Sequence, residues 1–254
     1  MITLACPPLS LLPFERALQM VEGKFGGWEI VAEGKHLLPV IKDELEEAIS
    51  SYGMKFTIHA PLSDINIGSL NPGIRTEALN QLVEVVRTTH QLGMERVTMH
   101  PGFLSPITFG KRELAKKMVR ASIEKIERRT KGTDVLKCLE NMPRSFITLF
   151  TEPKEMLDLI DGTSFKLCLD VGHANTTNNL SDFLQHWERY GSIHIHDNNG
   201  RTDEHLPIGE GEVDFRMVLR KLKDFKGDFV IESRSVEEGL AGRKYIESLD
   251  ITAP

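Results

Sequence analysis

The sequence predicts an α/β protein that forms a single (β/α)8 TIM barrel over residues 1–254, with its active site at the C-terminal rim of the strands. Three observations lead to this fold class. Short apolar runs alternate with amphipathic stretches along the chain, no linker or change in composition divides it, and 254 residues is close to the typical ~250 of such a barrel. Regular alternation implies parallel strands, which close when there are eight. An open doubly wound sheet would need a switch point and usually a glycine-rich first turn, which the sequence lacks.

The expected strands are short runs rich in apolar and β-branched residues. Proline or glycine follows several of them, as at Pro7, Pro61 and Pro101, and stops the strand there. Pairs of glycines can also open a strand, as at Gly26 and Gly27. On these grounds strands are expected at residues 2–6, 28–32, 55–59, 96–100, 134–141, 166–170, 192–196 and 228–232.

The expected helices carry apolar residues three and four positions apart. The second of them has an acidic outer face and ends at Gly53, and the third opens at Pro72 and is capped by Gly93. Each follows one of the strands, as the barrel requires. Helices are expected at residues 14–21, 36–52, 72–92, 111–129, 153–160, 180–190, 215–222 and 236–248.

Composition and charge restrict the kind of protein. Apolar residues make up 40% of the chain and charged residues 27%, which suits a soluble globular protein. The net charge of -6 argues against a broad basic surface for nucleic acid. The N-terminus does not resemble a signal peptide, and no apolar stretch reaches the roughly 18 residues of a membrane span, so we expect a cytoplasmic protein without a membrane partner. Cys6, Cys138 and Cys168 lack metal-binding spacing and are expected to be buried thiols.

One stretch, residues 192–215, is unusually rich in possible metal ligands. His194 and His196 alternate with isoleucines on an expected strand, so both imidazoles point to the same face. Asp203 and His205 follow in the next loop. One strand cannot complete a coordination sphere, so further ligands must come from elsewhere in the chain.

The other expected strands supply them at their C-terminal ends. In a (β/α)8 barrel these ends meet at one rim. Carboxylates and imidazoles crowded there would repel one another or lose solvation, and bound metal ions remove that penalty. The residues at strand ends are His59, His100, Glu140, Asp170 and Glu232, and those in the loops just beyond are His173, Asp203 and His205.

These residues lie in motifs that resemble one known superfamily. The motifs are IHAP at His59, MHPG at His100, LEN at Glu140, CLDVGH at Asp170 and His173, HIHD at His194, DEHLPIGEG at Asp203 and His205, and VIES at Glu232. Together they look like the xylose isomerase-like barrels, which include endonuclease IV and many sugar isomerases and epimerases. The resemblance follows nearly the whole chain in order.

The resemblance implies two alternative metal centres. In the endonuclease IV branch three zinc ions are bound, and every ligand has a match here: His59, His100 and Glu140 for one ion, Glu140, Asp170, His194 and Glu232 for a second, and His173, Asp203 and His205 for a third. The single-metal isomerase branch needs only two glutamates, an aspartate and a histidine. Glu140, Asp170, Glu232 and either His194 or His196 could hold its one Mn²⁺ or Mg²⁺; HIHD aligns best with His194 as the ligand.

The fuller ligand set favours a phosphoesterase with two or three zinc ions and with Glu140 and Glu232 as catalytic carboxylates. Its substrate would be abasic-site DNA or a smaller phosphorylated sugar. The loop after His59 has no aromatic residue to insert into a base stack, and the chain is acidic, so DNA is the less secure of the two. No protein partner can be inferred. Substrate contacts are expected from His196, Asn66, Arg201 and the backbone amides of Gly209 and Gly211.

The alternative is a single-metal sugar or sugar-phosphate isomerase or epimerase. There Glu140 and Glu232 would exchange a proton beside a metal-polarised carbonyl while His59 and His100 contact the substrate. A third hypothesis is a metal-binding or regulatory barrel without turnover. Metal stoichiometry would discriminate between these hypotheses.

Overall fold

Eight parallel strands pair in chain order, and β8 also pairs with β1, so the sheet closes into a barrel. The computed structural model describes residues 1–249, and residues 250–254 of the expected domain lie outside that part. The fold class predicted from the sequence is therefore confirmed. The strands are β1 Ile2–Ala5, β2 Gly27–Val31, β3 Lys55–His59, β4 Arg96–Met99, β5 Leu136–Glu140, β6 Lys166–Asp170, β7 Tyr190–Ile195 and β8 Phe229–Glu232.

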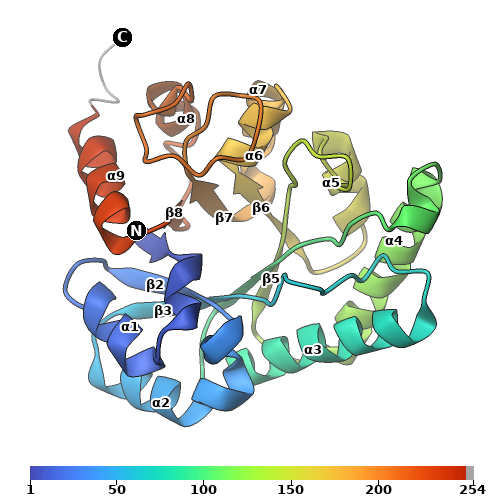
Figure 1. The fold of residues 1–254 in the computed structure, drawn as a ribbon, viewed down its shortest axis with the longest axis horizontal. Helices are drawn as coiled ribbons and strands as arrows, with labels where there is room; N and C mark the ends of the chain where they lie inside the picture. Colours follow the sequence, from blue (N-terminus) through green and yellow to red (C-terminus); the bar gives the residue numbers. More distant parts are fainter. Residues whose placement is uncertain (250–254) are drawn as a thin grey trace.

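The helices surround the strands, and α9 lies beside the N-terminus (Figure 1). Their apolar faces pack on the outside of the barrel, where residues such as Leu45, Leu82, Ile123 and Val218 are buried. The α-helices are α1 Phe14–Val21, α2 Leu38–Ser51, α3 Pro72–Gln91, α4 Arg112–Arg129, α5 Pro153–Ile160, α6 Val171–Thr176, α7 Leu180–Phe183, α8 Phe215–Lys221 and α9 Val236–Ser248. Short 3-10 helices are η1 Pro7–Leu11, η2 Gly34–His36, η3 Pro106–Thr108 and η4 Leu184–Arg189.

Local chemistry sets several helix starts. The Asn71 side chain accepts hydrogen bonds from the amides of Gly73 and Ile74 at the start of α3. Ser235 accepts one from the Glu238 amide at the start of α9. These side chains satisfy amides that have no partner within the helix, which fixes where each helix begins.

Two expectations for the second half of the chain are wrong in detail. Residues 180–190 were expected to form one helix, but they form α7 and then η4, and His186 has non-helical backbone angles of φ -111° and ψ 26°. The helix α6 was not expected at all. It begins directly after β6, so the βα loop that usually separates strand from helix is absent there.

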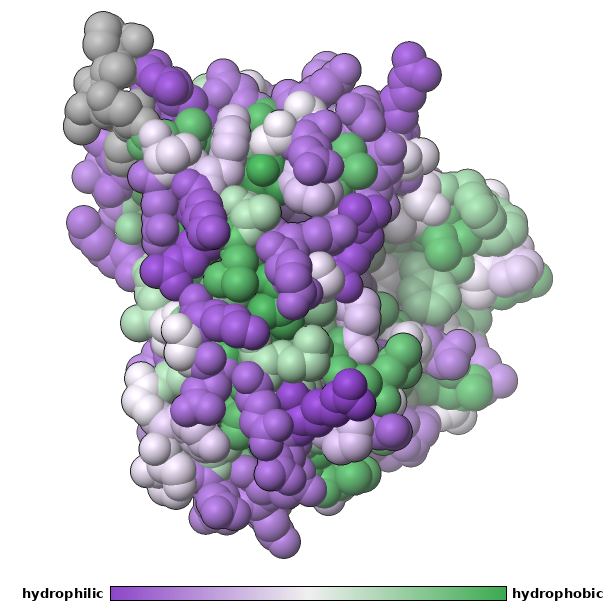
Figure 2. Space-filling view, turned by 60° about the vertical axis from the view of Figure 1, so that its left-hand side comes forward, coloured by the Kyte–Doolittle hydropathy of each residue, from purple (hydrophilic) through white to green (hydrophobic). Residues whose placement is uncertain are grey.

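Hydrophilic residues cover much of the molecular surface, with apolar areas between them (Figure 2). Among the large apolar side chains that are exposed, Ile107, Phe109 and Phe146 lie in the segments that follow β4 and β5 at the C-terminal rim, with Ile107 in η3. The Phe109 and Phe146 rings meet edge to face at 5.8 Å. Within residues 1–249, no helix is both long and apolar enough to cross a lipid bilayer.

Candidate metal centre

Glu140, at the end of β5, is the carboxylate around which the candidate site is arranged. Its Oε2 lies 3.3 Å from His59 Nε2 and 3.3 Å from His194 Nδ1. Its Oε1 lies 3.3 Å from His173 Nδ1 and 3.6 Å from His100 Nε2. Both oxygens of one buried carboxylate thus face imidazoles from different parts of the barrel rim, an arrangement suited to a carboxylate that bridges two cations.

A second group consists of Asp170, His194 and Glu232, whose ligand atoms all lie within 4.8 Å of one another. Strand pairing explains their proximity, because Asp170 is paired with His194 between β6 and β7, and Glu232 ends the neighbouring β8. His194 Nδ1 is 2.8 Å from Glu232 Oε1. All three side chains are buried.

A third group lies nearer to solvent and consists of His173, His196, Asp203 and His205. Asp203 Oδ2 is 3.1 Å from His173 Nε2 and 3.2 Å from His205 Nε2, and Asp203 Oδ1 is 3.4 Å from His196 Nε2. His205 has a φ of 48°. This left-handed conformation costs a non-glycine residue about 1–2 kcal/mol. Backbone strain of this kind is concentrated at functional sites.

The junction of β6 and α6 places two of these side chains. Asp170 Oδ1 accepts a hydrogen bond from the His173 amide at 2.6 Å, so the carboxylate at the strand end also caps the helix that carries His173. Gly172 in the same turn leaves room for His196, since a Cβ there would lie 2.0 Å from the His196 ring. The sequence Asp-Val-Gly-His therefore fixes the position of His173 and leaves space for His196 beside it.

Main-chain carbonyls orient two of the imidazoles. His59 Nδ1 lies 2.8 Å from the carbonyl oxygen of Ala60, and His173 Nδ1 lies 2.8 Å from that of Asn141. A carbonyl oxygen only accepts, so Nδ1 donates its proton to it and Nε2 is the nitrogen left for a cation. In both rings Nε2 faces a carboxylate of the site. Hydrogen bonds of this type are typical of metal-binding histidines.

A buried carboxylate that the sequence reading missed, Glu29, also reaches the site. It lies in the middle of β2 and is fully buried, with Oε1 2.8 Å from His194 Nε2. Its Oε2 accepts a hydrogen bond from Thr57 Oγ1 at 3.0 Å and pairs with Arg96 at 3.1 Å. Arg96 in turn pairs with Asp228 at 2.8 Å. A chain of charged groups therefore runs inside the barrel up to the site.

The carboxylates and imidazoles shift each other's pKa values. Burial would raise the pKa of Glu232, but His194 outweighs it and lowers that pKa to about 2. Burial likewise opposes the lowering of the Glu140 pKa, which neighbouring imidazoles hold well below its usual range. Burial lowers the pKa of His205, yet Asp203 and Glu232 raise it to about 9. The carboxylates therefore remain ionised near neutral pH and favour cations between them.

The arrangement fits bound metal ions better than a hydrogen-bonded network. Among the described residues, Asp170 Oδ2 and both ring nitrogens of His194 and of His196 are buried without a hydrogen-bond partner. His194 Nδ1 is within 2.8 Å of a carboxylate oxygen, but the two are not aligned as donor and acceptor. A bound cation would satisfy the nitrogen of each ring that faces the ligand groups, such as His194 Nδ1 beside Glu232 and His196 Nε2 beside Asp170. Nitrogen and carboxylate donors together suit zinc and similar transition metals.

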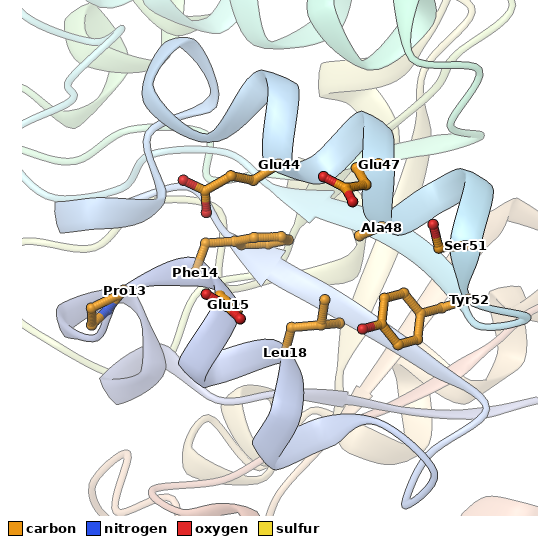
Figure 3. Close-up of a pocket in the computed structure, with 9 residues that line it drawn as sticks. All are labelled: Pro13, Phe14, Glu15, Leu18, Glu44, Glu47, Ala48, Ser51 and Tyr52. Carbon is orange, nitrogen blue, oxygen red and sulfur yellow. The ribbon is translucent and has the colours of Figure 1, made fainter.

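The side of the site formed by His100, Asp203 and His205 faces solvent. Their side chains are 22%, 26% and 26% exposed, whereas those of Glu140 and Asp170 are almost completely buried. A substrate would approach from this side. A separate cavity of about 460 Å³ lies on the outside of the barrel, between residues of α1 such as Phe14 and residues of α2 such as Glu44 (Figure 3). It shares no residue with the metal-ligand groups.

Three of the residues expected to contact the substrate make contacts within the protein instead. The amides of Gly209 and Gly211 donate to Asp197 Oδ2 at 2.9 and 3.0 Å, so they are already engaged and are not directed at a phosphate. The Asn66 side chain is engaged as well, because it donates to the Phe103 carbonyl and accepts from the Phe103 amide. Asn66 therefore joins two rim loops to each other.

The remaining two expected substrate contacts differ in position. His196 is fully buried among the metal-ligand candidates, with Nε2 3.1 Å from Asp170 Oδ1. The sequence left open whether His194 or His196 faces the metal, and the structure places each in a different ligand group. Arg201 is exposed in the loop that carries Asp203, where it stays a candidate for substrate contact.

Cys168 lies closer to the site than expected for an ordinary buried thiol. It is grouped with Glu140 and His194, with ligand atoms within 4.8 Å. Burial raises the pKa of the Cys168 thiol well above its usual value.

Comparison with known proteins identifies the family. The family model described as "Xylose isomerase-like TIM barrel" matches residues 19–252. The chain belongs to the xylose isomerase-like TIM barrel family. The resemblance expected from the motifs is thereby confirmed.

Relatives of this xylose isomerase-like barrel differ in their named activities. An uncharacterised protein of Methanocaldococcus jannaschii is 30% identical over 239 residues, which cover 90% of this chain and 82% of that protein. A probable endonuclease 4 of Aquifex aeolicus is 26% identical over 205 residues, which cover 72% of this chain and 71% of that protein. A solved structure described as a D-tagatose 3-epimerase-like protein has a TM-score of 0.89 at 28% identity, covering 97% of this chain and 95% of that one. The names of these relatives thus refer to two kinds of activity, that of an endonuclease and that of a sugar epimerase.

Proposed function

We propose that this protein is a divalent-metal-dependent phosphoesterase of the endonuclease IV type, with a centre of two or three zinc ions. The observation that supports this function most is the third ligand group, which includes His173, Asp203 and His205, beside the groups that contain Glu140. An isomerase with one metal ion has no use for these additional ligands. A phosphoesterase with several ions does, because one ion can activate water while another stabilises the leaving oxygen.

Each ligand group would hold one ion, and neighbouring groups share residues. His59, His100 and Glu140 form the first group, and Asp170, His194 and Glu232 form the second, which Glu140 also reaches through its Oε2. The third group is His173, Asp203 and His205, with His196 at hand as a further ligand. When bound, the ions would lower the pKa of a water molecule and stabilise developing negative charge on the leaving oxygen.

Glu140 and Glu232 are the candidate catalytic carboxylates. Both are ionised near neutral pH, since neighbouring imidazoles lower their pKa values against the effect of burial. An ionised carboxylate at the floor of the site can orient an attacking water and accept its proton. Glu232 Oε2 lies 3.6 Å from His205 Nδ1, on the side that faces solvent.

The substrate we propose is a sugar phosphoester, either an abasic site in DNA or a smaller sugar phosphate. The net charge of -6 weakens the case for extended contacts with a DNA backbone. The exposed Phe109 and Phe146 rings on the rim give some support to DNA, because apolar rings can stack on bases. The two substrates therefore require a direct comparison.

The second candidate function is a sugar or sugar-phosphate epimerase or isomerase with one Mn²⁺ or Mg²⁺ ion. The likeness to the D-tagatose 3-epimerase-like structure favours it. So does the position of Glu140 and Glu232 beside the same imidazole nitrogen, 3.3 Å and 2.8 Å from His194 Nδ1. Two carboxylates so placed could remove a proton next to a carbonyl and return it.

Metal analysis together with a substrate panel tests the proposal. The purified protein is analysed for bound metals and assayed with an abasic-site oligonucleotide, sugar phosphates and ketoses. We expect more than one tightly bound zinc per chain and release of a phosphoester product. One exchangeable Mn²⁺ or Mg²⁺ together with turnover of a ketose would overturn the phosphoesterase and support the epimerase.

A further inference from the structure

The imidazole of His194 is oriented differently from those of His59 and His173. In His59 and His173, Nδ1 donates to a main-chain carbonyl and Nε2 faces the site. In His194, Nδ1 faces the site carboxylates Glu140 and Glu232, and Nε2 faces away from them, towards Glu29. The opposite nitrogen is therefore available to a metal ion.

We propose that Glu29 is a positioning residue that keeps the proton of His194 on Nε2, so that His194 binds its metal ion through Nδ1. Nε2 lies 2.8 Å from Glu29 Oε1, and both side chains are fully buried. An ionised carboxylate is only an acceptor, so the nitrogen beside it must carry the proton. Glu29 Oε1 and His194 Nε2 are both buried, and neither has another hydrogen-bond partner within residues 1–249, so each is available to the other. This inference rests on the metal centre of the proposed function.

The surroundings of Glu29 keep it ionised and fixed in place. Thr57 Oγ1 donates to Glu29 Oε2 at 3.0 Å, and Arg96 Nη2 lies 3.1 Å from the same oxygen. Arg96 is itself held by Asp228, at 2.8 Å from Oδ2. With Oε2 occupied by these donors, Oε1 is the oxygen left to receive the imidazole proton. Carboxylates in this position orient a metal-binding imidazole and increase its basicity.

The variant Glu29→Gln gives a sharp prediction because an amide has only one accepting oxygen. Arg96 and Thr57 donate to the position of Oε2 and would draw that oxygen towards themselves. The amide NH2 would then face His194 Nε2, which must become an acceptor. The remaining proton of a neutral ring would move to Nδ1, where it competes with the metal ion.

The experiment combines nitrogen NMR on the zinc-loaded wild-type protein with zinc-affinity measurements on variants. In the wild type, ¹⁵N spectra of the histidines should show His194 protonated at Nε2 and bound to zinc through Nδ1, and His59 and His173 bound through Nε2. Chelator competition should show that Glu29→Gln weakens zinc binding by about 10- to 100-fold, the usual effect of removing such a partner. Far-UV circular dichroism checks that the variant is folded.

Asp228→Asn is the matched control. Asp228 is also a buried carboxylate that pairs with Arg96, but its other ion pairs are with Lys55 and the N-terminal amine and not with His194. We expect Asp228→Asn to change zinc affinity by less than about threefold. Zinc coordination by His194 Nε2, or a Glu29→Gln variant that binds zinc as tightly as the wild type, would overturn the inference alone. A wild-type protein that takes up no zinc, Mn²⁺ or Mg²⁺ would overturn both this inference and the proposed function.

Discussion

His59 Nε2 lies 3.3 Å from Glu140 Oε2, although 81 positions separate the two residues in the chain. His59 ends β3 and Glu140 ends β5, and β4 lies between them in the barrel. Side chains at the ends of alternate strands can meet over the barrel interior because the strands tilt and close. The contact therefore depends on closure of the whole sheet.

Replacing Glu140 by glutamine should nearly abolish activity. Both carboxylate oxygens face imidazoles of the ligand groups. An amide has only one oxygen that can bind a metal ion, and that oxygen carries no charge. Glu140→Gln should lower kcat/KM by more than about 100-fold and reduce the bound metal. Steady-state kinetics and elemental analysis measure both effects. The exposed Glu188→Gln serves as the control, and retention of activity by Glu140→Gln would contradict the bridging role.

Removing Asp203 should empty one ion site and leave the others. Asp203 contacts His173, His196 and His205 but not the His59 group. Asp203→Ala should therefore lose one zinc ion per chain, as measured by elemental analysis after chelator washing. Glu204→Gln is the matched control, since Glu204 faces Asn199. An unchanged zinc content in Asp203→Ala would mean that the outer group does not hold an ion.

Asp197 should stabilise the loop between β7 and α8 and take no direct part in the reaction. It accepts hydrogen bonds from the amides of Gly209, Gly211 and Val213, and so holds the loop that carries Asp203. Asp197→Asn should lower the free energy of unfolding by about 1.5–3 kcal/mol, the range for a hydrogen bond to a charged group. Urea denaturation measures this, and hydrogen exchange of the three amides should accelerate. If their exchange is unaffected, the carboxylate does not hold the loop.

Arg96→Met should destabilise the fold in a manner that depends on pH. The substitution leaves Glu29 and Asp228 buried without their shared cation, which costs about 3–5 kcal/mol. Burial raises the pKa of Asp228, but Lys55 and Arg96 outweigh it and lower that pKa in the folded state. The pairing therefore stabilises the wild type fully above the unfolded pKa of aspartate, and this stabilisation is lost as the pH falls.

The loss of unfolding free energy in Arg96→Met relative to the wild type should accordingly shrink once the pH falls below the unfolded pKa of aspartate. Urea unfolding at about pH 7 and at about pH 3 measures the difference. The exposed Arg189→Met is the control, for which little change is expected at either pH. An equal deficit at both pH values would argue that Arg96 acts through packing and not through its charge.

The strand ends could be predicted from the sequence because the signals there are local. A histidine one or two positions before a proline, as His100 before Pro101 and His59 before Pro61, identifies both the end of a strand and its side of the barrel. Glu29 could not be recognised in the same way, since it lies in mid-strand in GWEIV, where a glutamate is more often solvent-exposed. Only the closed barrel shows that this position faces inwards, towards Arg96 and His194.

Contacts within the loops could not be predicted from the sequence either. A Gly-Glu-Gly turn suggests amides that are available to an anion, but the anion that they bind is the protein's own Asp197. The kink at His186 went unnoticed because the apolar spacing continues through it. Contacts such as those of Asp197 depend on residues that are close in space but distant in sequence, and the spacing of residues along the chain does not reveal them.

The double role of Asp170 has a consequence for how such a protein can change over time. Because one carboxylate both offers an oxygen to the ligand groups and starts the helix that carries His173, mutations at position 170 alter folding and metal affinity together. Selection would then preserve this residue under almost any chemistry that uses the centre. New substrate preferences would arise more readily in exposed rim segments, such as the one around Phe146, where a mutation leaves the ligand groups unchanged.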